Sequence, residues 1–311
     1  MADRIATRVA YGNTLAALGE TRHFFVMDAD LSGSTQTAIF GKKFPDRFIN
    51  CGIAEANMVS AAAGIAAAGT PVFCSSFAMF ACGRAYEQIR NSVAYPKLNV
   101  KICASHGGIT VGEDGATHQY CEDLAVMRAT PNMVVVNPAD ATETVKAIEA
   151  ILDYDGPVYC RLGRFAVPVV FDPATYKFEL GKGNVLADGK DVAIFATGIM
   201  NAAALEAREQ LKAYGVDAAI IDIHTIKPID KDLIAHYAAK TGAVVTAEEH
   251  NIIGGLGSAV AEVLAETVPT KMARVGIEDI FGTSASAEVL LDYYKLNAQG
   301  IVEKTLKLLG K

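Results

Sequence analysis

The sequence predicts an α/β protein with two domains, each built around a parallel β-sheet. The first observation is size: 311 residues, 51% of them hydrophobic and 20% charged, exceed the roughly 100–200 residues of one ordinary domain. The second is a repeated alternation of short strand-like runs with helical patterns of about 10–15 residues, which is typical of βαβ units. The same composition excludes intrinsic disorder.

The first domain is expected at residues 1–170. Apolar residues recur at helical spacing from Arg4 to Leu18, and the strand-like run "HFFVMDAD" then opens into a Ser/Gly loop. Further strand-like runs are "RFIN", "PVFCSS", "NVKICAS", "NMVVVN" and "PVYCRL". The helical patterns between them begin near Ala54, Ala78, Glu122 and Ala139.

Residues 171–190 are expected to link the domains, because they are rich in Pro, Gly and charged residues and lack a sustained period. The second domain is expected at residues 191–311. Its strand-like runs are "DVAIFATG", "VDAAIIDI", "GAVVTAEEH" and "MARVGI", and its helices begin near Asn201, Lys231 and Leu256.

Composition also limits the class of partner. The net charge is −7, and no dense block of Lys or Arg is present, which argues against nucleic acid. The longest apolar run, residues 61–68, is shorter than the roughly 18 residues that span a membrane, and the first residues do not resemble a signal peptide. We therefore expect no membrane partner and a cytoplasmic location. The six cysteines lack C-x-x-C spacing, which favours reduced core thiols.

Candidate functional residues are sought beyond the carboxyl ends of the strands, where parallel sheets bind ligands. Glu55 lies there, at the entrance to "ANMVSAAAGIAAAG". An ordinary interpretation is that Glu55 stabilises the helix dipole, by about 0.3–1 kcal/mol. However, the helix has no polar face and is expected to be buried all round. Desolvation favours a neutral carboxyl, which can donate a proton or hydrogen bond at neutral pH.

Residues 106–119 form a second candidate. They contain His106 and His118 together with Glu113 and Asp114. A turn-rich loop is the ordinary interpretation of such a segment. Two imidazoles and two carboxylates beyond a strand end exceed what a turn requires, so a functional loop is predicted.

Aromatic and basic side chains leave alternatives open. Phe77 and Phe80 have the i, i+3 spacing of helical core aromatics, but their place after "PVFCSS" would also suit a platform under a planar ring. Arg8 and Arg161 could be surface charges. If they converge with His106, they would form an anion site, because Arg binds phosphate through a planar fork.

Four motifs taken together, "GIAEANM", "SSFAMF", "GEDGATHQ" and "YCRLGR", resemble the C-terminal half of transketolase in order and approximate spacing. The resemblance covers essentially the whole chain. It implies a thiamine diphosphate pyrimidine-binding domain followed by a transketolase C-terminal domain. It also implies that Glu55 hydrogen-bonds N1′ of the cofactor's aminopyrimidine and so promotes removal of the thiazolium C2 proton. The cofactor supplies the carbanion chemistry, and the protein supplies binding and orientation.

The resemblance extends to single positions. It implies that Phe77 and Phe80 support the pyrimidine, and that Leu31 supports the bent cofactor. It implies that His118 faces the substrate carbonyl or C1 hydroxyl, and that Asp114 recognises the C2 hydroxyl of an aldose acceptor. The positions that match a sugar-phosphate site are Arg8, Ser34, His106 and Arg161, of which His106 is also a candidate catalytic residue.

One part of the family pattern is missing. Transketolases hold the diphosphate and Mg²⁺ through a Gly-Asp-Gly motif followed about thirty residues later by Asn, and this sequence contains no such pair. A highly charged diphosphate then lacks its metal-bridged anchor. The resemblance therefore implies the β-like subunit of a split transketolase, with no metal ligand of its own. The thiamine diphosphate would be shared with an N-terminal partner subunit carrying the Mg²⁺ ligands, most simply in an α2β2 assembly in which this chain also dimerises.

Other functions stay open at this point. Gly83 stands where many transketolases have tyrosine, and "RAYEQ" is more similar to 1-deoxyxylulose-5-phosphate synthase. His106, where that synthase typically has an acidic residue, favours ketol transfer from a ketose phosphate to an aldose. The β subunit of a 2-oxoacid dehydrogenase and a non-catalytic subunit are the remaining alternatives.

Overall fold

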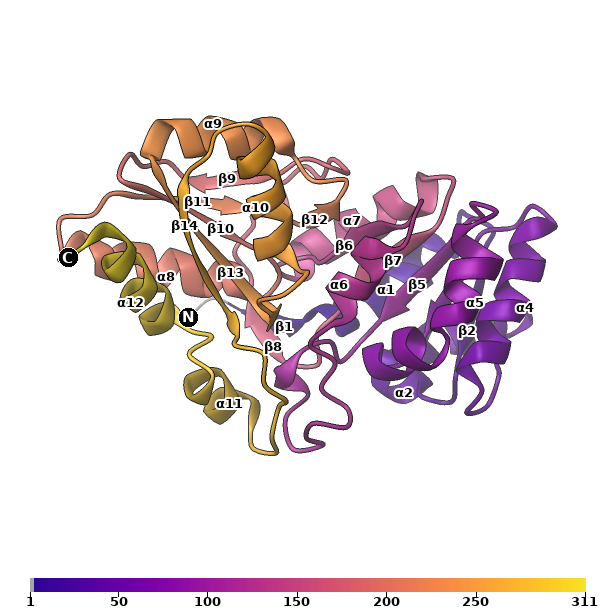
Figure 1. The fold of residues 1–311 in the computed structure, drawn as a ribbon. Helices are drawn as coiled ribbons and strands as arrows, with labels where there is room; N and C mark the ends of the chain where they lie inside the picture. Colours follow the sequence, from indigo (N-terminus) through magenta and orange to yellow (C-terminus); the bar gives the residue numbers. More distant parts are fainter. Residues whose placement is uncertain (1–2) are drawn as a thin grey trace.

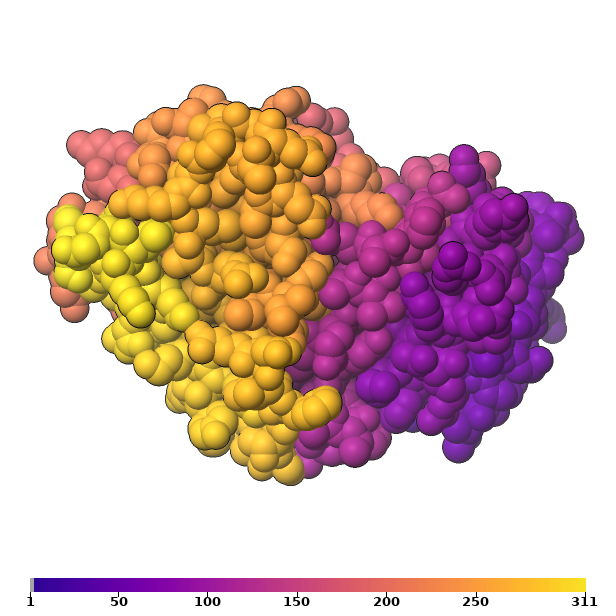
Figure 2. Space-filling view, viewed as in Figure 1, coloured from indigo at the N-terminus to yellow at the C-terminus, as the bar shows by residue number. Residues whose placement is uncertain are grey.

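The computed structural model describes residues 3–311 as two α/β domains that lie side by side, as Figure 1 shows. The predicted fold class is confirmed. In a space-filling view the surfaces of the two domains adjoin (Figure 2). No helix within residues 3–311 combines the length and the apolar character needed to cross a membrane.

The first domain is built on a seven-stranded sheet in the order β12-β6-β7-β5-β4-β2-β3. Its strands are parallel except β12, which pairs antiparallel with β6. The strands are β2 (Phe25–Asp28), β3 (Phe48–Asn50), β4 (Val72–Ser75), β5 (Val100–Ala104), β6 (Val134–Val136), β7 (Val158–Arg161) and β12 (Thr225–Lys227). A separate pair, β1 (Arg4–Ala6) with β8 (Ala166–Pro168), is antiparallel.

Helices cover both faces of this sheet, because its central strands are buried on both sides. One face packs against α1 (Thr7–Leu18), α3 (Ala38–Lys43) and α7 (Ala141–Asp153). The other packs against α4 (Glu55–Ala67), α6 (Asp123–Ala129) and the segment from Met79 to Ala94. Shorter helical turns are α2 (Ser32–Thr35), α5 (Tyr86–Gln88), η1 (Pro45–Arg47) and η4 (Ile109–Val111).

The second domain has a five-stranded sheet in the order β14-β13-β10-β11-β9, in which only β9 is antiparallel. The strands are β9 (Asn184–Ala187), β10 (Val192–Ala196), β11 (Ala218–Asp222), β13 (Ala243–Asn251) and β14 (Lys271–Ile277). The helices are α8 (Met200–Lys212), α9 (Lys231–Thr241), α10 (Leu256–Glu266), α11 (Ala287–Tyr293) and α12 (Ala298–Leu309).

Two details differ from the expectations. The helix expected from Ala78 consists largely of two π-helical turns, η2 (Met79–Arg84) and η3 (Ile89–Ala94). In addition, α4 is not buried all round, because a stripe along it is exposed. The exposed positions are small or short polar residues at helical spacing, namely Asn57, Ser60, Ala61, Gly64 and Ala67.

The segment 171–190 is not purely a linker, because it supplies β9 to the second sheet. The second domain in turn supplies β12 to the first sheet. The largest apolar cluster also joins the two domains, since it contains Met27 and Val72 of the first together with Phe195 and Val260 of the second. One of the three apolar clusters is therefore continuous between the two domains.

Candidate active site

Glu55 is almost completely buried, with 1% of its surface exposed, in the first turn of α4. Its Oε2 accepts a hydrogen bond of 2.8 Å from Nη1 of Arg84, and the Ser76 hydroxyl lies 3.5 Å from its Oε1. Arg84 is the last residue of the π-helical turn η2, and half of its side chain is exposed. A carboxylate removed from water is thus paired with a cation that reaches solvent.

Four rings form an aromatic cluster beside this carboxylate. Phe77 stacks on His106 with ring centroids 3.7 Å apart, so one face of Phe77 is covered. Phe80 contacts His118 edge to face at 5.2 Å. Phe80 is only partly buried, whereas Phe77 is 8% exposed. Of the two expected platform residues, Phe80 is the one with an accessible surface.

The guanidinium of Arg84 lies over that accessible ring, 4.9 Å from the Phe80 centroid. One planar group with N–H donors therefore contacts both Phe80 and Glu55. An aminopyrimidine is also planar and also needs an aromatic surface and a carboxyl partner. The residues present fit the pyrimidine half of thiamine diphosphate, with Glu55 and Phe80 as the groups that would hold it.

His106 occupies the start of the loop of residues 106–119 in a left-handed backbone conformation, with φ of 60°, which is uncommon for residues other than Gly, although His adopts it more often than most. Its Nδ1 lies 2.8 Å from the Ser105 hydroxyl. Burial first, and then the nearby cations of Arg8 and Arg164, lower the pKa of His106 to about 3. The ring is therefore neutral at physiological pH.

Arg8 and Arg164 form the basic side of this site. Nη1 of Arg8 donates to the backbone oxygen of Ser34 at 2.6 Å, and the Arg8 Nε is buried without a partner among residues 3–311. Burial and the Arg164 charge lower the pKa of Arg8. Arg164 also pairs with Glu113 at 3.0 Å. Two guanidinium groups close enough to repel one another are suited to bind an anion.

Arg161, which the sequence pattern suggested for the same anion, is placed elsewhere. It is 4% exposed, and its Nε donates to Asp123 at 2.8 Å while its Nη2 donates to the backbone oxygen of Glu249 at 2.9 Å. This residue ends β7 and faces the junction with the second domain. Arg164 was missed, although it lies in the same "YCRLGR" motif and beyond the strand end, where ligand-binding residues are expected.

The loop of residues 106–119 is held by the second domain. The Glu249 carboxylate accepts the Thr110 backbone N–H at 2.7 Å, and the Gln119 amide donates to the Thr283 oxygen at 2.8 Å. His118 and Asp114 lie on this loop, His118 partly buried against Phe80 and Asp114 exposed. Both domains therefore determine the position of the two histidines.

Leu31 and Ser34 lie in the turn that follows β2. Asp28, fully buried at the end of that strand, accepts hydrogen bonds from the Leu31 N–H at 2.6 Å and from the hydroxyls of Thr35 at 2.6 Å and Thr37 at 2.8 Å. These bonds position Ser34 against Arg8. The structure brings together most of the predicted residues, and it adds Arg84, which the sequence analysis did not single out.

Comparisons with known proteins agree with this geometry. The profile of the transketolase pyrimidine-binding domain matches residues 3–169, and that of the transketolase C-terminal domain matches residues 181–301. The chain belongs to the transketolase family. Over nearly its whole length it corresponds to the C-terminal subunit of a split transketolase, as the following relatives indicate.

A putative transketolase C-terminal section from Methanocaldococcus jannaschii is 52% identical over 98% of this chain and 96% of that protein. A subunit of a 6-deoxy-6-sulfo-D-fructose transketolase from Clostridium sp. is 45% identical over 89% of this chain and 85% of that protein. The solved structure of a split-gene transketolase, an inactive β4 tetramer, is 52% identical and covers 98% of this chain and 99% of that chain, with a TM-score of 0.92.

Proposed function

We propose that this chain is the β-like subunit of a thiamine diphosphate-dependent transketolase that transfers a two-carbon ketol unit from a ketose phosphate to an aldose. The observation that carries the proposal is the buried Glu55 carboxylate beside the accessible Phe80 ring. When bound, the cofactor supplies a carbanion equivalent at C2 of its thiazolium. Glu55 would donate a hydrogen bond to the aminopyrimidine as the general acid of the site.

The residues around this pair are assigned roles in substrate binding. His118 would face the substrate carbonyl or C1 hydroxyl, and Asp114 the C2 hydroxyl of the acceptor. His106 is neutral at physiological pH, so it would serve as a hydrogen-bonding group rather than as a cation. Leu31 would support the cofactor from the loop after β2.

The substrate is proposed to carry a phosphate. Arg8 and Arg164 supply two guanidinium groups, and the unpartnered Arg8 Nε leaves a donor free for an anion. Ser34 lies against Arg8. Relatives in this family differ in their sugars, and that of the Clostridium relative is sulfonated rather than phosphorylated. An anionic group is the feature that two arginines would recognise.

An N-terminal subunit is proposed to complete the site. The sequence lacks the Gly-Asp-Gly motif that would hold the diphosphate and Mg²⁺. Next to Glu55, Ile53 is 77% exposed, and the small-residue stripe of α4 continues this uncovered surface. The related split-gene β chain forms an inactive tetramer by itself. We therefore assign this surface to partner chains in an α2β2 assembly.

The test is to mix the purified chain with a candidate N-terminal subunit, thiamine diphosphate and Mg²⁺, and to follow ketose-phosphate consumption with an aldose acceptor. Turnover is expected only in the mixture. Glu55→Gln should lower kcat by about 100-fold or more, because an amide cannot replace the acid, while Glu87→Gln, an exposed glutamate on α5, should leave it unchanged.

Three other outcomes would contradict the proposed function or part of it. Decarboxylation of pyruvate by the mixture would point to the synthase or 2-oxoacid dehydrogenase alternatives. Unchanged turnover in the Glu55→Gln variant would remove the role proposed for Glu55. An assembled mixture without turnover on either class of substrate would support a non-catalytic subunit.

A further inference from the structure

Arg84 occupies the place between Glu55 and Phe80 that, under the proposed function, would hold the pyrimidine half of the cofactor. Its guanidinium contacts Glu55 at 2.8 Å and lies over the Phe80 ring, 4.9 Å from the centroid. Phe77 offers little alternative surface, because His106 stacks on one face at 3.7 Å and the residue is 8% exposed. Two planar groups cannot share one place between a ring and a carboxylate, so Arg84 and an aminopyrimidine must compete for it.

We propose that Arg84 closes the pyrimidine site of the free chain and that cofactor binding requires its displacement. This inference rests on the proposed function, since it takes the aminopyrimidine as the incoming group. Arg84 is thus a positioning residue, which acts on the chemistry through Glu55. It keeps the carboxylate paired while no cofactor is bound, and it exchanges places with the ring when one binds.

The surroundings of Arg84 make this displacement feasible. The side chain is 51% exposed and extends from the end of the π-helical turn η2. Its contacts with Glu55 and Phe80 lie on its buried side, so rotation of the side chain moves the cation into water. π-helical turns are frequent at functional sites. The cation loses little hydration by moving, whereas the carboxylate it leaves behind stays buried.

That asymmetry has a consequence for binding. Once Arg84 has moved into water, the buried Glu55 carboxyl keeps only the Ser76 hydroxyl, 3.5 Å from its Oε1, as a side-chain partner among residues 3–311. A planar ring that takes the vacated place can therefore form a hydrogen bond with Glu55.

The probe for this competition is thiamine, which carries the pyrimidine without the diphosphate. Its affinity for the purified chain would be measured by ligand-observed NMR and calorimetry. Arg84→Met keeps an unbranched side chain without the charge, and it should bind thiamine about tenfold more tightly than the unmodified chain, because the site no longer has to open first. Arg90→Met is the matched control, since Arg90 is an exposed arginine bonded to its neighbour Asn91, and it should leave the affinity unchanged.

The direction of the affinity change separates the two possible roles of Arg84. A purely structural role would make Arg84→Met bind thiamine equally or more weakly, whereas displacement predicts tighter binding. Glu55→Gln in the Arg84→Met background should abolish the gain in affinity, which locates the binding at this site.

Equal thiamine affinity in the unmodified chain and Arg84→Met, including no binding to either, would overturn the inference. That result is separate from a failure of the proposed function, which is judged by turnover with the N-terminal subunit. Turnover with no effect of Arg84→Met on thiamine binding would retain the function and reject the competition. Tighter thiamine binding by Arg84→Met, without turnover of the mixture, would retain the competition and reject the proposed function.

Discussion

At the scale of single residues, two arginines three positions apart have different environments. Arg161 is enclosed by Asp123 and the Glu249 backbone, and burial of all these groups makes the pairing difficult to break. Arg164 is partly exposed next to Arg8 and His106. The first is suited to join the domains, and the second is suited to bind substrate.

These environments predict opposite effects of the same change. Arg161→Met should lower the free energy of unfolding by about 3–5 kcal/mol, because it leaves buried carboxylates unpaired. Arg164→Met should leave stability within about 0.5 kcal/mol but raise KM for a phosphorylated substrate about tenfold or more. Urea unfolding and steady-state kinetics of the assembled enzyme check both. If Arg161→Met raised KM without changing stability, and Arg164→Met did not raise KM, then Arg161 rather than Arg164 would bind the anion.

At the scale of elements, the turn after β2 depends on one buried carboxylate. Asp28 accepts bonds from the Leu31 N–H and from the hydroxyls of Thr35 and Thr37. The four-residue helix α2 (Ser32–Thr35) is too short to be stable alone. Asp28 therefore fixes the loop that carries Leu31 and Ser34.

Asp28→Asn should loosen this loop, because the two Thr hydroxyls, which now donate to one carboxylate oxygen, must reverse and accept from the N–H₂ group if the amide oxygen is to keep the Leu31 N–H, at a cost of about 1 kcal/mol. The expected result is a several-fold rise in KM for the phosphorylated substrate with little change in kcat. Asp30→Asn is the matched control, two residues further along and exposed, and its kinetics should stay unchanged. Equal kinetics of both variants would show that the loop does not depend on Asp28.

The elements also show what the sequence could predict. The strands were predictable because buried parallel strands are continuous apolar runs, as in Val192–Ala196 and Ala218–Asp222. The π-helical turns were not, because short π-helical segments inside a helix leave no apolar period of their own that separates them from an α-helix. The aromatic cluster followed from motifs around Phe77 and His118, whereas the placement of Arg161 depends on Glu249, which is 88 residues away in sequence.

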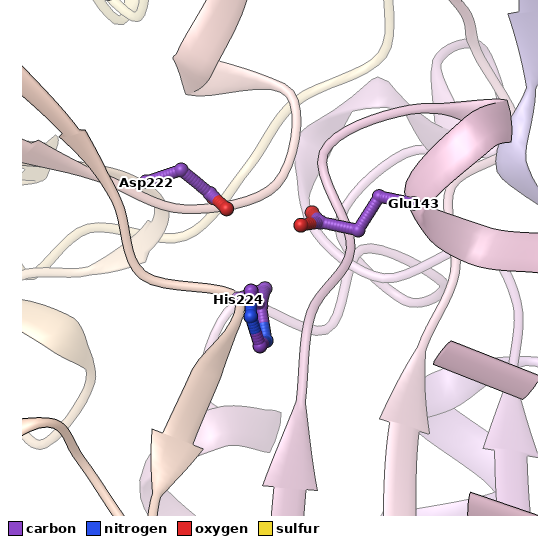
Figure 3. Close-up of side chains that lie close together, drawn as sticks. All are labelled: Glu143, Asp222 and His224. Atoms are coloured by element: carbon purple, nitrogen blue, oxygen red, sulfur yellow. The ribbon is translucent and has the colours of Figure 1, made fainter. Parts of the chain in front are cut away.

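At the scale of the whole molecule, a buried acidic pair lies at the junction of the domains. Figure 3 shows the carboxylates of Glu143 and Asp222 pointing toward one another near the His224 ring. Glu143 lies on α7 of the first domain and Asp222 ends β11 of the second. Burial raises the pKa of Asp222 to about 6, and burial together with the Asp222 charge raises that of Glu143 well above its usual value. Both carboxyls therefore hold a proton more readily in the folded chain than in the unfolded one.

These raised pKa values give the stability of the protein a pH dependence. Carboxyls of the unfolded chain titrate near pH 4, so the folded chain binds more protons above that pH. The contribution of Asp222 is complete below about pH 4 and is lost as the pH rises through about 6, and that of Glu143 is lost over a range that extends to higher pH. Glu143→Gln, which resembles the protonated acid, should reduce the loss of unfolding free energy between pH 5 and 8 by about 1 kcal/mol or more.

Urea unfolding at pH 5 and pH 8 measures this difference. Glu179→Gln, an exposed glutamate between the domains in sequence, serves as the control and should behave like the unmodified chain. If Glu143→Gln shows the same pH dependence as this control, folding does not raise the pKa of Glu143 at the junction.

The strand β12 has a practical consequence for any attempt to study the domains separately. A fragment ending near residue 180 would retain β6 but lose the antiparallel strand that covers it. The row of backbone N–H and C=O groups thus exposed on β6 would be free to pair with another copy, and uncovered strands of this kind promote aggregation. A fragment starting there would carry β12 without its sheet. Expression of either half as a soluble piece is therefore expected to fail unless the Thr225–Lys227 segment is supplied to the first or removed from the second.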